Sequence, residues 1–532
     1  MAGFDLERFV KTADRIRNTA RKEGRLTDNP TEDVLRELLM KEPGIRETKY
    51  CNFAAESEPS SRSAMFTKNS VDSQFGLDEE KMLAECEACL AKEKLICVDR
   101  IVGNDNSGTS VRLIVPERFA HIAGGGANLF GVPRSPVKTP TYQIVFFADE
   151  AFATNQSKPL PEKDITIRLA MLEDGRYVKV IRNGNYTGEY KKGVFAAEDW
   201  FAKKTGKGIF LHAGCRTDYL ESVHGDYSWT STLLVALSAN GKTTTSCKIL
   251  ARKGNEQSWL VQDDGGTLTP QGGFLGFEAG GVFVKTEAVN PGQQQEIYYG
   301  LMKPSTVCEN VFVTPDGDYD FYNFQKTSNG RAVVCRRDFM HASRNIDVER
   351  VDNLILITRG PLIPAISKLT REQAAALMIL GQAMESSAGD PTRAGTIRSE
   401  FFYDPFVAGS LAQHANCFYD IVRGLPHLNY YLLNTGWVGE GEHYLDIRLE
   451  FTMGILDSLL RGGLEDWTAS PTGFQVPRAV RSVDDIYSHP EKLYSQSEFQ
   501  EKLNELNRMR YDAVEKVGGE LHPSIRRVFD KV

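Results

Sequence analysis

The stretch that decides the fold is STLLVALSANGKTTTSC, residues 231–247. Its first half is an apolar run typical of a buried strand, and its second half places a glycine and a lysine before three threonines. Backbone N–H groups around Gly241 and Lys242 can point at one anion, and Lys242 adds positive charge for outer phosphates. The hydroxyl of Thr243 can bind Mg²⁺. The stretch therefore indicates a phosphate-binding turn between a strand and a helix.

This turn departs from the usual pattern GxxxxGK[ST], because Ala236 and Ala239 stand where glycine is common. Glycine permits positive φ and a close backbone approach, so alanine restricts the loop to conformations that a β-carbon tolerates. Support comes from WLVQDDGG, residues 259–266, which reads as a strand that ends in Asp263 and Asp264. Metal-binding acids are expected at that place, so the two stretches together favour a nucleotide site.

The bulk composition limits the classes of protein to consider. The chain has 532 residues, which predicts two or three domains rather than one small core. Hydrophobic residues make up 41% and charged residues 25%, as in ordinary globular proteins. The net charge of -8 argues against nucleic-acid binding through bulk positive charge. An anionic substrate then requires a local cluster of cations.

No apolar run approaches the roughly 20 residues that a membrane span needs, so no membrane association is expected. The N-terminal residues MAGFDLERFVKTADRIRN alternate charged with apolar side chains and lack the apolar core of a secretory signal. The nine cysteines are scattered and odd in number, which predicts neither a disulfide framework nor a zinc site. These features together predict a cytoplasmic protein.

The pattern along the chain predicts an α/β fold. Residues 5–42 have helical spacing, whereas short strand-like runs separated by turn residues fill 50–210 and continue from 209. After 368 the pattern becomes mainly helical. We expect an N-terminal domain, residues 1–208, and a C-terminal nucleotide domain, residues 209–532.

A series of stretches resembles phosphoenolpyruvate carboxykinase, and the ATP-dependent branch of that family best. They occur in the family's order over most of the chain: SSRSA (60–64), NYTGEYKKGVF (185–195), LHAGCR (211–216), ALSANGKTT (236–244), LVQDDGG (260–266), FEAGGVFVKT (277–286), QEIYYGL (295–301), ASRNIDV (342–348), PAISKLT (364–370) and LLNTGWVGEG (432–441). The resemblance implies a two-domain carboxykinase-like fold whose mixed-sheet C-terminal domain carries a P-loop. It also implies a reaction in which oxaloacetate and ATP give phosphoenolpyruvate, CO₂ and ADP.

The resemblance assigns a role to each matching residue. Arg62 would bind the carboxylate of oxaloacetate or the released CO₂, and Tyr186 would position the small substrate. Lys192, His212 and Asp264 would hold Mn²⁺. A lysine ligand must be a neutral amine, and Lys191 and a dication beside Lys192 could lower its pKa enough.

The nucleotide would lie on the loop and on residues beyond it. Lys242 would neutralise the moving phosphoryl group, Thr243 would bind the Mg²⁺ of the nucleotide, and Arg344 would bridge the γ-phosphate and the substrate. Asp263 would support the metal site. The remaining expected nucleotide contacts are Ser238, Ala239, Asn240, Gly241, Thr244, Glu296 and Thr452. Residues 386–402, rich in glycine, serine and threonine, stand where the family has a mobile lid.

Several alternatives stay open. SANGKT partly resembles the GTP-dependent branch, although the NTGW segment and the chain length favour ATP. A shifted alignment replaces Arg62 with Asn69 and removes the oxaloacetate arginine. A kinase of the same fold that acts on another small molecule or a protein needs Lys242, Asp264 and Arg344 but not Arg62. A non-catalytic nucleotide-binding relative is the third possibility. We expect a monomer or a small homo-oligomer.

Overall fold

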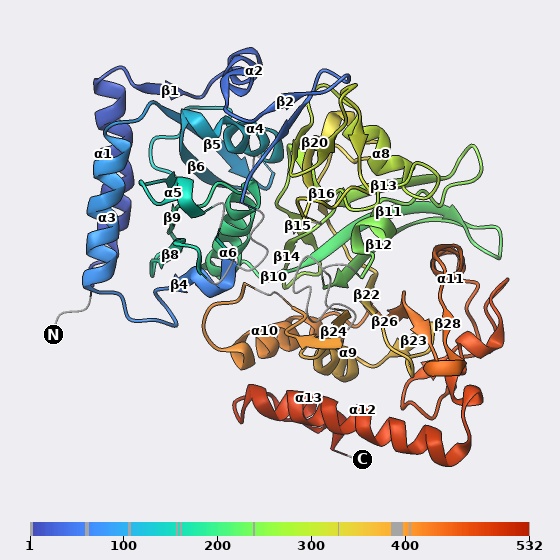
Figure 1. The fold of residues 1–532 in the computed structure, drawn as a ribbon. Helices are drawn as coiled ribbons and strands as arrows, with labels where there is room; N and C mark the ends of the chain where they lie inside the picture. The colour runs from blue at the N-terminus through green and yellow to red at the C-terminus, as the bar shows by residue number, and fades with distance from the viewer. Residues whose placement is uncertain are drawn as a thin grey trace. The chain divides into compact units, whose positions relative to one another are not determined.

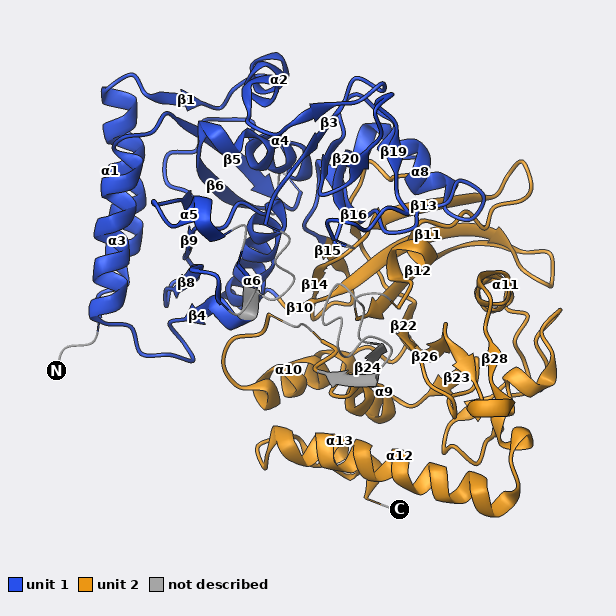
Figure 2. Ribbon diagram, viewed as in Figure 1, with its two compact units in different colours: residues 1–207, 276–340 blue, residues 208–275, 341–532 orange. Residues whose placement is uncertain are grey.

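The computed structural model describes residues 4–58, 63–104, 108–155, 158–159, 162–237, 240–327, 329–384, 397–403 and 406–530. The chain forms two compact units, residues 1–207 with 276–340 and residues 208–275 with 341–532 (Figure 2). The single boundary expected at 208/209 assigns 276–340 to the second part. In the structure this segment belongs to the first unit, because three of its strands share a sheet with two strands from the N-terminal part.

Most elements of the first unit are labelled in Figure 1. Its helices are α1 (Glu7–Lys22), α2 (Glu32–Lys41), α3 (Leu77–Leu90), α4 (Ala120–Leu129), α5 (Phe152–Asn155), α6 (Thr187–Thr205) and α8 (Gln295–Leu301). Its strands are β1 (Leu26–Asp28), β2 (Arg46–Glu47), β3 (Phe53–Ala55), β4 (Thr67–Asn69), β5 (Leu95–Val102), β6 (Thr109–Pro116), β7 (Tyr142–Phe147), β8 (Thr166–Met171), β9 (Tyr177–Arg182), β16 (Gly281–Lys285), β17 (Val307–Glu309), β18 (Phe312–Val313), β19 (Tyr319–Asp320) and β20 (Arg331–Cys335).

Two mixed sheets organise this unit. The larger has the order β1-β5-β6-β7-β9-β8-β4, with the pairs β6–β7 and β7–β9 parallel and the pairs β5–β6 and β8–β9 antiparallel. Helices α1 and α3 pack on one side of it around a core that contains Phe9, Cys86 and Phe147. The smaller sheet has the order β16-β20-β17-β3-β2. The strand-like runs predicted between residues 94 and 183 are therefore confirmed as β5 to β9.

The second unit has its own elements. Its helices are α7 (Lys242–Cys247), α9 (Arg371–Leu377), α10 (Leu411–Arg423), α11 (Leu449–Leu460), α12 (Gln496–Val517) and α13 (Pro523–Arg526). Its strands are β10 (Ile209–Leu211), β11 (Ala213–Glu221), β12 (Tyr227–Ala236), β13 (Gln257–Gln262), β14 (Gly266–Leu268), β15 (Phe274–Gly276), β21 (Asp347–Val348), β22 (Asn353–Thr358), β23 (Ile366–Leu369), β24 (Gly381–Met384), β25 (Ile397–Glu400), β26 (Asn429–Asn434), β27 (Trp437–Val438), β28 (Leu445–Asp446), β29 (Thr468–Ala469) and β30 (Gln475–Val476).

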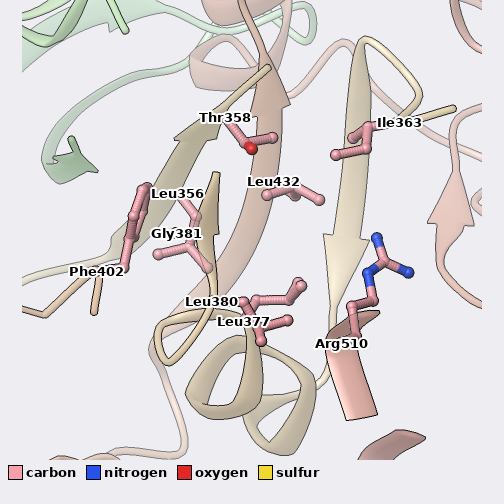
Figure 3. Close-up of a pocket in the computed structure, with 9 residues that line it drawn as sticks. All are labelled: Leu356, Thr358, Ile363, Leu377, Leu380, Gly381, Phe402, Leu432 and Arg510. Atoms are coloured by element: carbon pink, nitrogen blue, oxygen red, sulfur yellow. The ribbon is translucent and has the colours of Figure 1, made fainter. Parts of the chain in front are cut away.

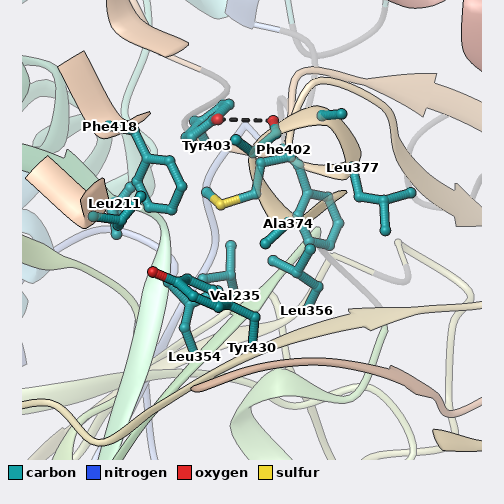
Figure 4. Packing of buried hydrophobic residues seen from close by; sticks show 14 of the residues in the cluster. Leu211, Val235, Leu354, Leu356, Ala374, Leu377, Phe402, Tyr403, Phe418 and Tyr430 are labelled. Carbon is teal, nitrogen blue, oxygen red and sulfur yellow. Dashed lines mark hydrogen bonds between the residues drawn. The ribbon is translucent and has the colours of Figure 1, made fainter. Parts of the chain in front are cut away.

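A mixed sheet in the order β13-β11-β12-β22-β26-β23-β30-β29 forms the frame of this unit. Its central strands β12, β22 and β26 run parallel. All six residues of β22 are buried, and the apolar run LILI at its centre is typical of a parallel strand covered on both faces. One face carries the core drawn in Figure 4, where Leu356, Phe402 and Phe418 pack together. Tyr403 lies in this core, and its hydroxyl donates to the carbonyl of Ala375 at 2.9 Å.

Two elements differ from the sequence pattern. Helix α4, AHIAGGGANL, contains three glycines, which helix propensity disfavours. The glycines let it approach α6 closely, since a β-carbon at Gly126 would lie 2.8 Å from Cε1 of Tyr190. Strand β26 lies at the centre of the sheet although the pattern after 368 looks helical. In both places tertiary packing overrides the local signal.

The cysteines form no disulfide among the described residues, and nine free thiols are found. Cys86 and Cys89 have the C-x-x-C spacing within α3. Cys86 is fully buried, and burial raises the pKa of both thiols. This pair therefore packs as apolar side chains. Within the described ranges, no helix has the length and apolar character needed to cross a membrane.

Candidate active site

The turn between β12 and α7 is fixed by its neighbours at the carboxyl ends of two further strands. Gly241 has φ 87°, a left-handed conformation that favours glycine, and α7 begins at the next residue. Asn240 is fully buried, and its Nδ2 donates to the carbonyl of Ile357 at 3.4 Å. The hydroxyl of Thr435 donates to the carbonyl of Asn240 at 2.8 Å. The sequence after β12 thus folds back onto β22 and the segment after β26.

Three predicted residues meet beside this turn. The Nζ of Lys242 contacts the carboxylate of Asp264 and lies 3.2 Å from its carbonyl oxygen. The Nε2 of His212 lies 3.0 Å from Oδ1 of the same carboxylate. His212 lies between β10 and β11, and Asp264 follows β13, so three separate elements position the group. One carboxylate therefore has an imidazole and an ammonium as neighbours.

A second acidic residue extends this cluster. The hydroxyl of Thr243 donates to Oδ2 of Asp263 at 3.3 Å, and Asp263 is buried. Thr244, half-exposed, is the next residue of α7. The two neighbouring acids thus divide their contacts, since Asp263 accepts from the threonine and Asp264 faces the histidine and the lysine.

The chemistry of this donor set fits a divalent cation. A carboxylate oxygen and an imidazole nitrogen 3.0 Å apart are both common metal ligands. No group of three His, Cys, Asp or Glu side chains within the described parts of the chain could hold a metal. His212 and Asp264 can thus supply two ligands, and the remainder must come from another side chain type, water or substrate.

Arg344 lies on a segment that runs beside β13. Ala342 forms a parallel bridge with Leu260, and the N–H of Ser343 donates to the carbonyl of Leu260 at 2.7 Å. Arg344 is the next residue and is solvent-exposed. Because the bridge is parallel, the chain at Arg344 runs in the same direction as β13, which leads to Asp263. Among the described residues, the structure shows no hydrogen bond or ion pair between this arginine and the cluster of His212, Lys242 and Asp264.

Tyr186 and Lys192 lie together at the start of α6 in the first unit. Tyr186 is buried, and the Nζ of Lys192 lies 5.4 Å from the centroid of its ring. The Nζ of Lys192 is also 3.6 Å from Oε1 of Glu189. Burial lowers the pKa of Lys192, Glu189 raises it, and the nearby cations Lys179 and Arg331 lower it again, with a net decrease. Lys192 therefore loses its proton, and becomes a neutral amine, more readily than an ordinary lysine.

The neighbouring lysine has a different environment. The Nζ of Lys191 pairs with Oε1 of Glu278 at 3.1 Å and lies over the ring of Phe283 at 4.8 Å. Because α6 turns the two side chains to different faces, only Lys192 lies beside Tyr186. The two neighbouring lysines thus have different surroundings.

A buried charged network, which the sequence did not suggest, holds the start of α6. His121 is fully buried in α4, and its Nδ1 contacts the carboxylate of Glu42. Its Nε2 lies 2.8 Å from the carbonyl of Asn185 and 3.3 Å from Oε1 of Glu309. That same Glu309 oxygen accepts the N–H of Thr187 at 2.8 Å. The network therefore fixes the residues on both sides of Tyr186.

The protonation of His121 follows from its two carboxylate neighbours. Burial lowers the pKa of the imidazole, but the charges and hydrogen bonds of Glu42 and Glu309 raise it by more than burial lowers it, so the pKa is about 10. The side chain is therefore an imidazolium at neutral pH. No motif marks this residue, because its partners come from distant parts of the chain.

Asn434 explains why the NTGW segment is ordered. It is fully buried, and its Nδ2 donates to the carbonyls of Gly360, Ile363 and Trp437 at 2.9, 2.7 and 2.9 Å. Its Oδ1 accepts the N–H of Gly436 at 3.0 Å. This side chain thus ties the turn that carries Thr435 to the segment after β22, and so supports Asn240 indirectly.

The remaining predicted residues are distributed as follows. Arg62, Ser238 and Ala239 lie outside the described residues, as does most of the expected lid at 386–402. The described part of the lid contains β25, which pairs with β24 in antiparallel register. Glu296 is buried at the start of α8, and Thr452 is buried in α11.

Comparison with known proteins gives one family. The model of the family described as phosphoenolpyruvate carboxykinase matches residues 67–486. A protein of Aeropyrum pernix named phosphoenolpyruvate carboxykinase (ATP) is 28% identical over 423 residues, 79% of this chain and 80% of that protein. The equivalent protein of Christiangramia forsetii is 27% identical over 365 residues, 66% of this chain and 64% of that protein. One from Campylobacter jejuni is 26% identical over 322 residues, 59% of this chain and 57% of that protein. Arg62 precedes the segment that the family model matches.

Proposed function

Because the chain belongs to the phosphoenolpyruvate carboxykinase family, we propose that it converts oxaloacetate and ATP into phosphoenolpyruvate, CO₂ and ADP. The observation that carries this proposal is the cluster of His212, Lys242 and Asp264 beside the β12–α7 turn. It places a candidate cation site and the ammonium group of Lys242 beside the turn that joins strand β12 to helix α7. Both are needed to stabilise negative charge on an enolate and on a phosphoryl group.

We propose that the β12–α7 turn is the phosphate-binding loop, formed by Ser238, Ala239, Asn240, Gly241, Lys242, Thr243 and Thr244. The left-handed Gly241 supports this role, because it turns the chain directly into the first N–H groups of α7. Lys242 pairs with Asp264 in the structure, and a bound γ-phosphate offers it a second anionic partner. Thr243 is placed beside an acid, as a residue that shares a nucleotide-bound Mg²⁺ requires.

The residues present fit a second divalent cation, which we propose to be Mn²⁺. His212 and Asp264 would hold it, with the neutral amine of Lys192 as a third ligand. The lowered pKa of Lys192 supports this role, because only the deprotonated amine can bind a metal. A cation bound there supplies positive charge next to the oxygen that becomes negative when CO₂ leaves.

The chain's residues then have defined tasks in the two steps. When the bond to the departing CO₂ breaks, its electron pair forms the enolate, whose oxygen attacks the γ-phosphorus of ATP. The bond between that phosphorus and the β–γ bridging oxygen breaks, and ADP leaves. Lys242 and Arg344 stabilise the charge on the transferring group, and Tyr186 and Arg62 orient oxaloacetate. Glu296 and Thr452 are the further proposed nucleotide contacts.

We propose that the first unit contributes Tyr186 to the binding of the small substrate and that the second unit carries the phosphate-binding loop. Preference for ATP over GTP is supported by the names of the relatives, which all specify the ATP form. It is also supported by the NTGW segment, residues 434–437, which resembles the ATP-dependent branch. The two alanines in the loop make this preference worth direct measurement.

A variant series tests the proposal. We expect Lys242→Ala to abolish phosphoenolpyruvate formation and to weaken ATP binding in calorimetry. Arg62→Ala should abolish turnover of oxaloacetate but leave ATP binding unchanged, which a kinase for another acceptor would not show. Lys253→Ala, whose side chain is 62% exposed, is the matched control. If Arg62→Ala retains full activity, oxaloacetate is not recognised in this way. If Lys242→Ala retains it, the loop assignment is wrong.

A further inference from the structure

Arg510 is a buried cation without an ionic partner. It lies in α12 with 2% of its surface exposed and packs between the rings of Phe474 and Phe529, at 5.1 and 5.5 Å from their centroids. Its Nη1 donates to Oδ1 of Asn507 at 3.1 Å. No carboxylate within the described residues forms an ion pair with it. Burial lowers its pKa to about 10, so the guanidinium still carries a positive charge at neutral pH.

Two other buried arginines of this chain show the usual solution. Arg112, also 2% exposed, forms two hydrogen bonds to Asp99 at 2.7 and 2.9 Å. Arg216, 1% exposed, forms two hydrogen bonds to Asp218, both at 2.7 Å. An unpaired buried ion destabilises the fold, so a buried guanidinium is often neutralised by an anion. Arg510 departs from this pattern, because no carboxylate among the described residues pairs with it.

A small cavity lies against this guanidinium. It is lined by Leu356, Thr358, Ile363, Leu377, Leu380, Gly381, Phe402, Leu432 and Arg510. Figure 3 shows that the guanidinium of Arg510 and the hydroxyl of Thr358 are the polar side-chain groups among an apolar lining. One cationic donor and one hydroxyl donor in an otherwise apolar wall suit an anion, because all other contacts are with hydrocarbon.

The size of the cavity decides which anion fits. Its volume is about 20 Å³, whereas a site for one water requires roughly 10–15 Å³ on the same measure. Phosphate, sulfate and organic carboxylates contain four or more heavy atoms or a carbon skeleton and are too large. A monatomic halide is comparable to one water molecule. We propose that Arg510 and Thr358 bind one chloride-sized monovalent anion in this cavity.

This site lies below the segment that carries the candidate loop. Thr358 ends β22, and its carbonyl accepts the N–H of Thr435, the residue that holds Asn240. The preceding residue, Ile357, accepts from the side chain of Asn240. A bound anion therefore stabilises the strand end on which the loop rests. The inference itself does not depend on the reaction proposed above.

Crystals of the full chain soaked in bromide provide the direct test. We expect an anomalous bromide peak in the cavity beside Arg510 and no such peak in Arg510→Met. Electron density of a water with no bromide at that place would overturn the proposal. A peak that persists in Arg510→Met would also overturn it, because the guanidinium would then not be the ligand.

Thermal unfolding provides an independent test in solution. At constant ionic strength, replacing sodium gluconate with sodium chloride should raise the unfolding midpoint of the wild type along a saturating curve. The same shift is expected for Arg508→Met, a solvent-exposed arginine on the same helix, and it should be lost in Arg510→Met. Equal shifts in the two variants, or no shift in the wild type, would contradict an anion site at Arg510.

Discussion

The most quantitative prediction concerns the buried imidazolium of His121. Its pKa is raised from 6.5 to about 10 by Glu42 and Glu309 against the opposing effect of burial. A group whose pKa is higher in the folded state stabilises the fold fully below the unfolded pKa. That stabilisation is lost as pH rises through the folded pKa. The window for this residue therefore extends from about pH 6.5 to about pH 10.

The magnitude follows from the shift. At about 1.4 kcal/mol per pKa unit, the protonated imidazole contributes about 4 kcal/mol at pH 7 and about 1.5 kcal/mol at pH 9. The comparison protein is the triple variant Glu42→Gln, His121→Asn, Glu309→Gln, in which the same cluster has no titrating group. The stability difference between wild type and this variant should decrease by about 2–3 kcal/mol between pH 7 and pH 9.

The assay is equilibrium urea unfolding at several pH values, observed by ¹⁹F NMR of protein labelled with 5-fluorotryptophan. Trp200 lies in α6 of the first unit and reports on the unit that contains His121. His224→Asn, whose side chain is 71% exposed, is the control and should leave the pH dependence unchanged. A stability difference that is flat between pH 7 and 9, or that increases with pH, would refute the reasoning.

Three further predictions concern individual side chains. Gly241→Ala adds no clash but places a β-carbon on a residue with φ 87°, at a cost of about 1–2 kcal/mol, so the affinity for ATP in calorimetry should fall about tenfold. The control Gly254→Ala also adds no clash, and because Gly254 does not have a positive φ, it should leave the affinity unchanged. Asn434→Ala removes four hydrogen bonds and should destabilise the second unit by about 2–4 kcal/mol in urea unfolding. The exposed control Asn429→Ala should change the free energy of unfolding little, and equal effects of the two variants would contradict the role assigned to the NTGW turn. Lys192→Met should stabilise the first unit at pH 7, because a lysine whose pKa is lowered by folding opposes folding at that pH. The gain in stability should shrink as the pH approaches 10.5, and a gain that grows with pH would be inconsistent with a lowered pKa.

Much of the fold could be predicted from the sequence, because strands with strong apolar runs are recognisable by their composition. The runs that became β5, β6, β7 and β22 are each buried on both faces, so their composition alone indicates strands. The segment 276–340 could not be assigned to its unit in this way. Its strands are ordinary in pattern, and their partner β3 comes from the beginning of the chain.

The helix α4 shows the same limit from the opposite side. Its glycines predict a loop by propensity, yet they are what allows the helix to contact Leu39, Thr187 and Tyr190 closely. A local pattern cannot contain this information, since the reason for each glycine lies on another element. Pattern-based prediction therefore fails where close packing between distant segments decides the structure.

The candidate site divides along a similar line. His212, Lys242 and Asp264 were predicted from motifs, and the structure brings them into contact. His121 was not predicted, because it lies in no motif and its carboxylate partners Glu42 and Glu309 come from distant parts of the chain. The role of Arg62 remains a prediction from sequence. Residues that bind ligands directly leave short signatures, whereas those that hold them in place depend on the whole fold.

The measurement that tests the central claim most directly is ³¹P NMR of a reaction of the purified protein with oxaloacetate, Mg²⁺, Mn²⁺ and either ATP or GTP. The account predicts that phosphoenolpyruvate and ADP appear in equal amounts with ATP, that GTP gives no product, and that Lys242→Ala is inactive. Formation of ADP without phosphoenolpyruvate, or no product with either nucleotide, would contradict the proposed reaction.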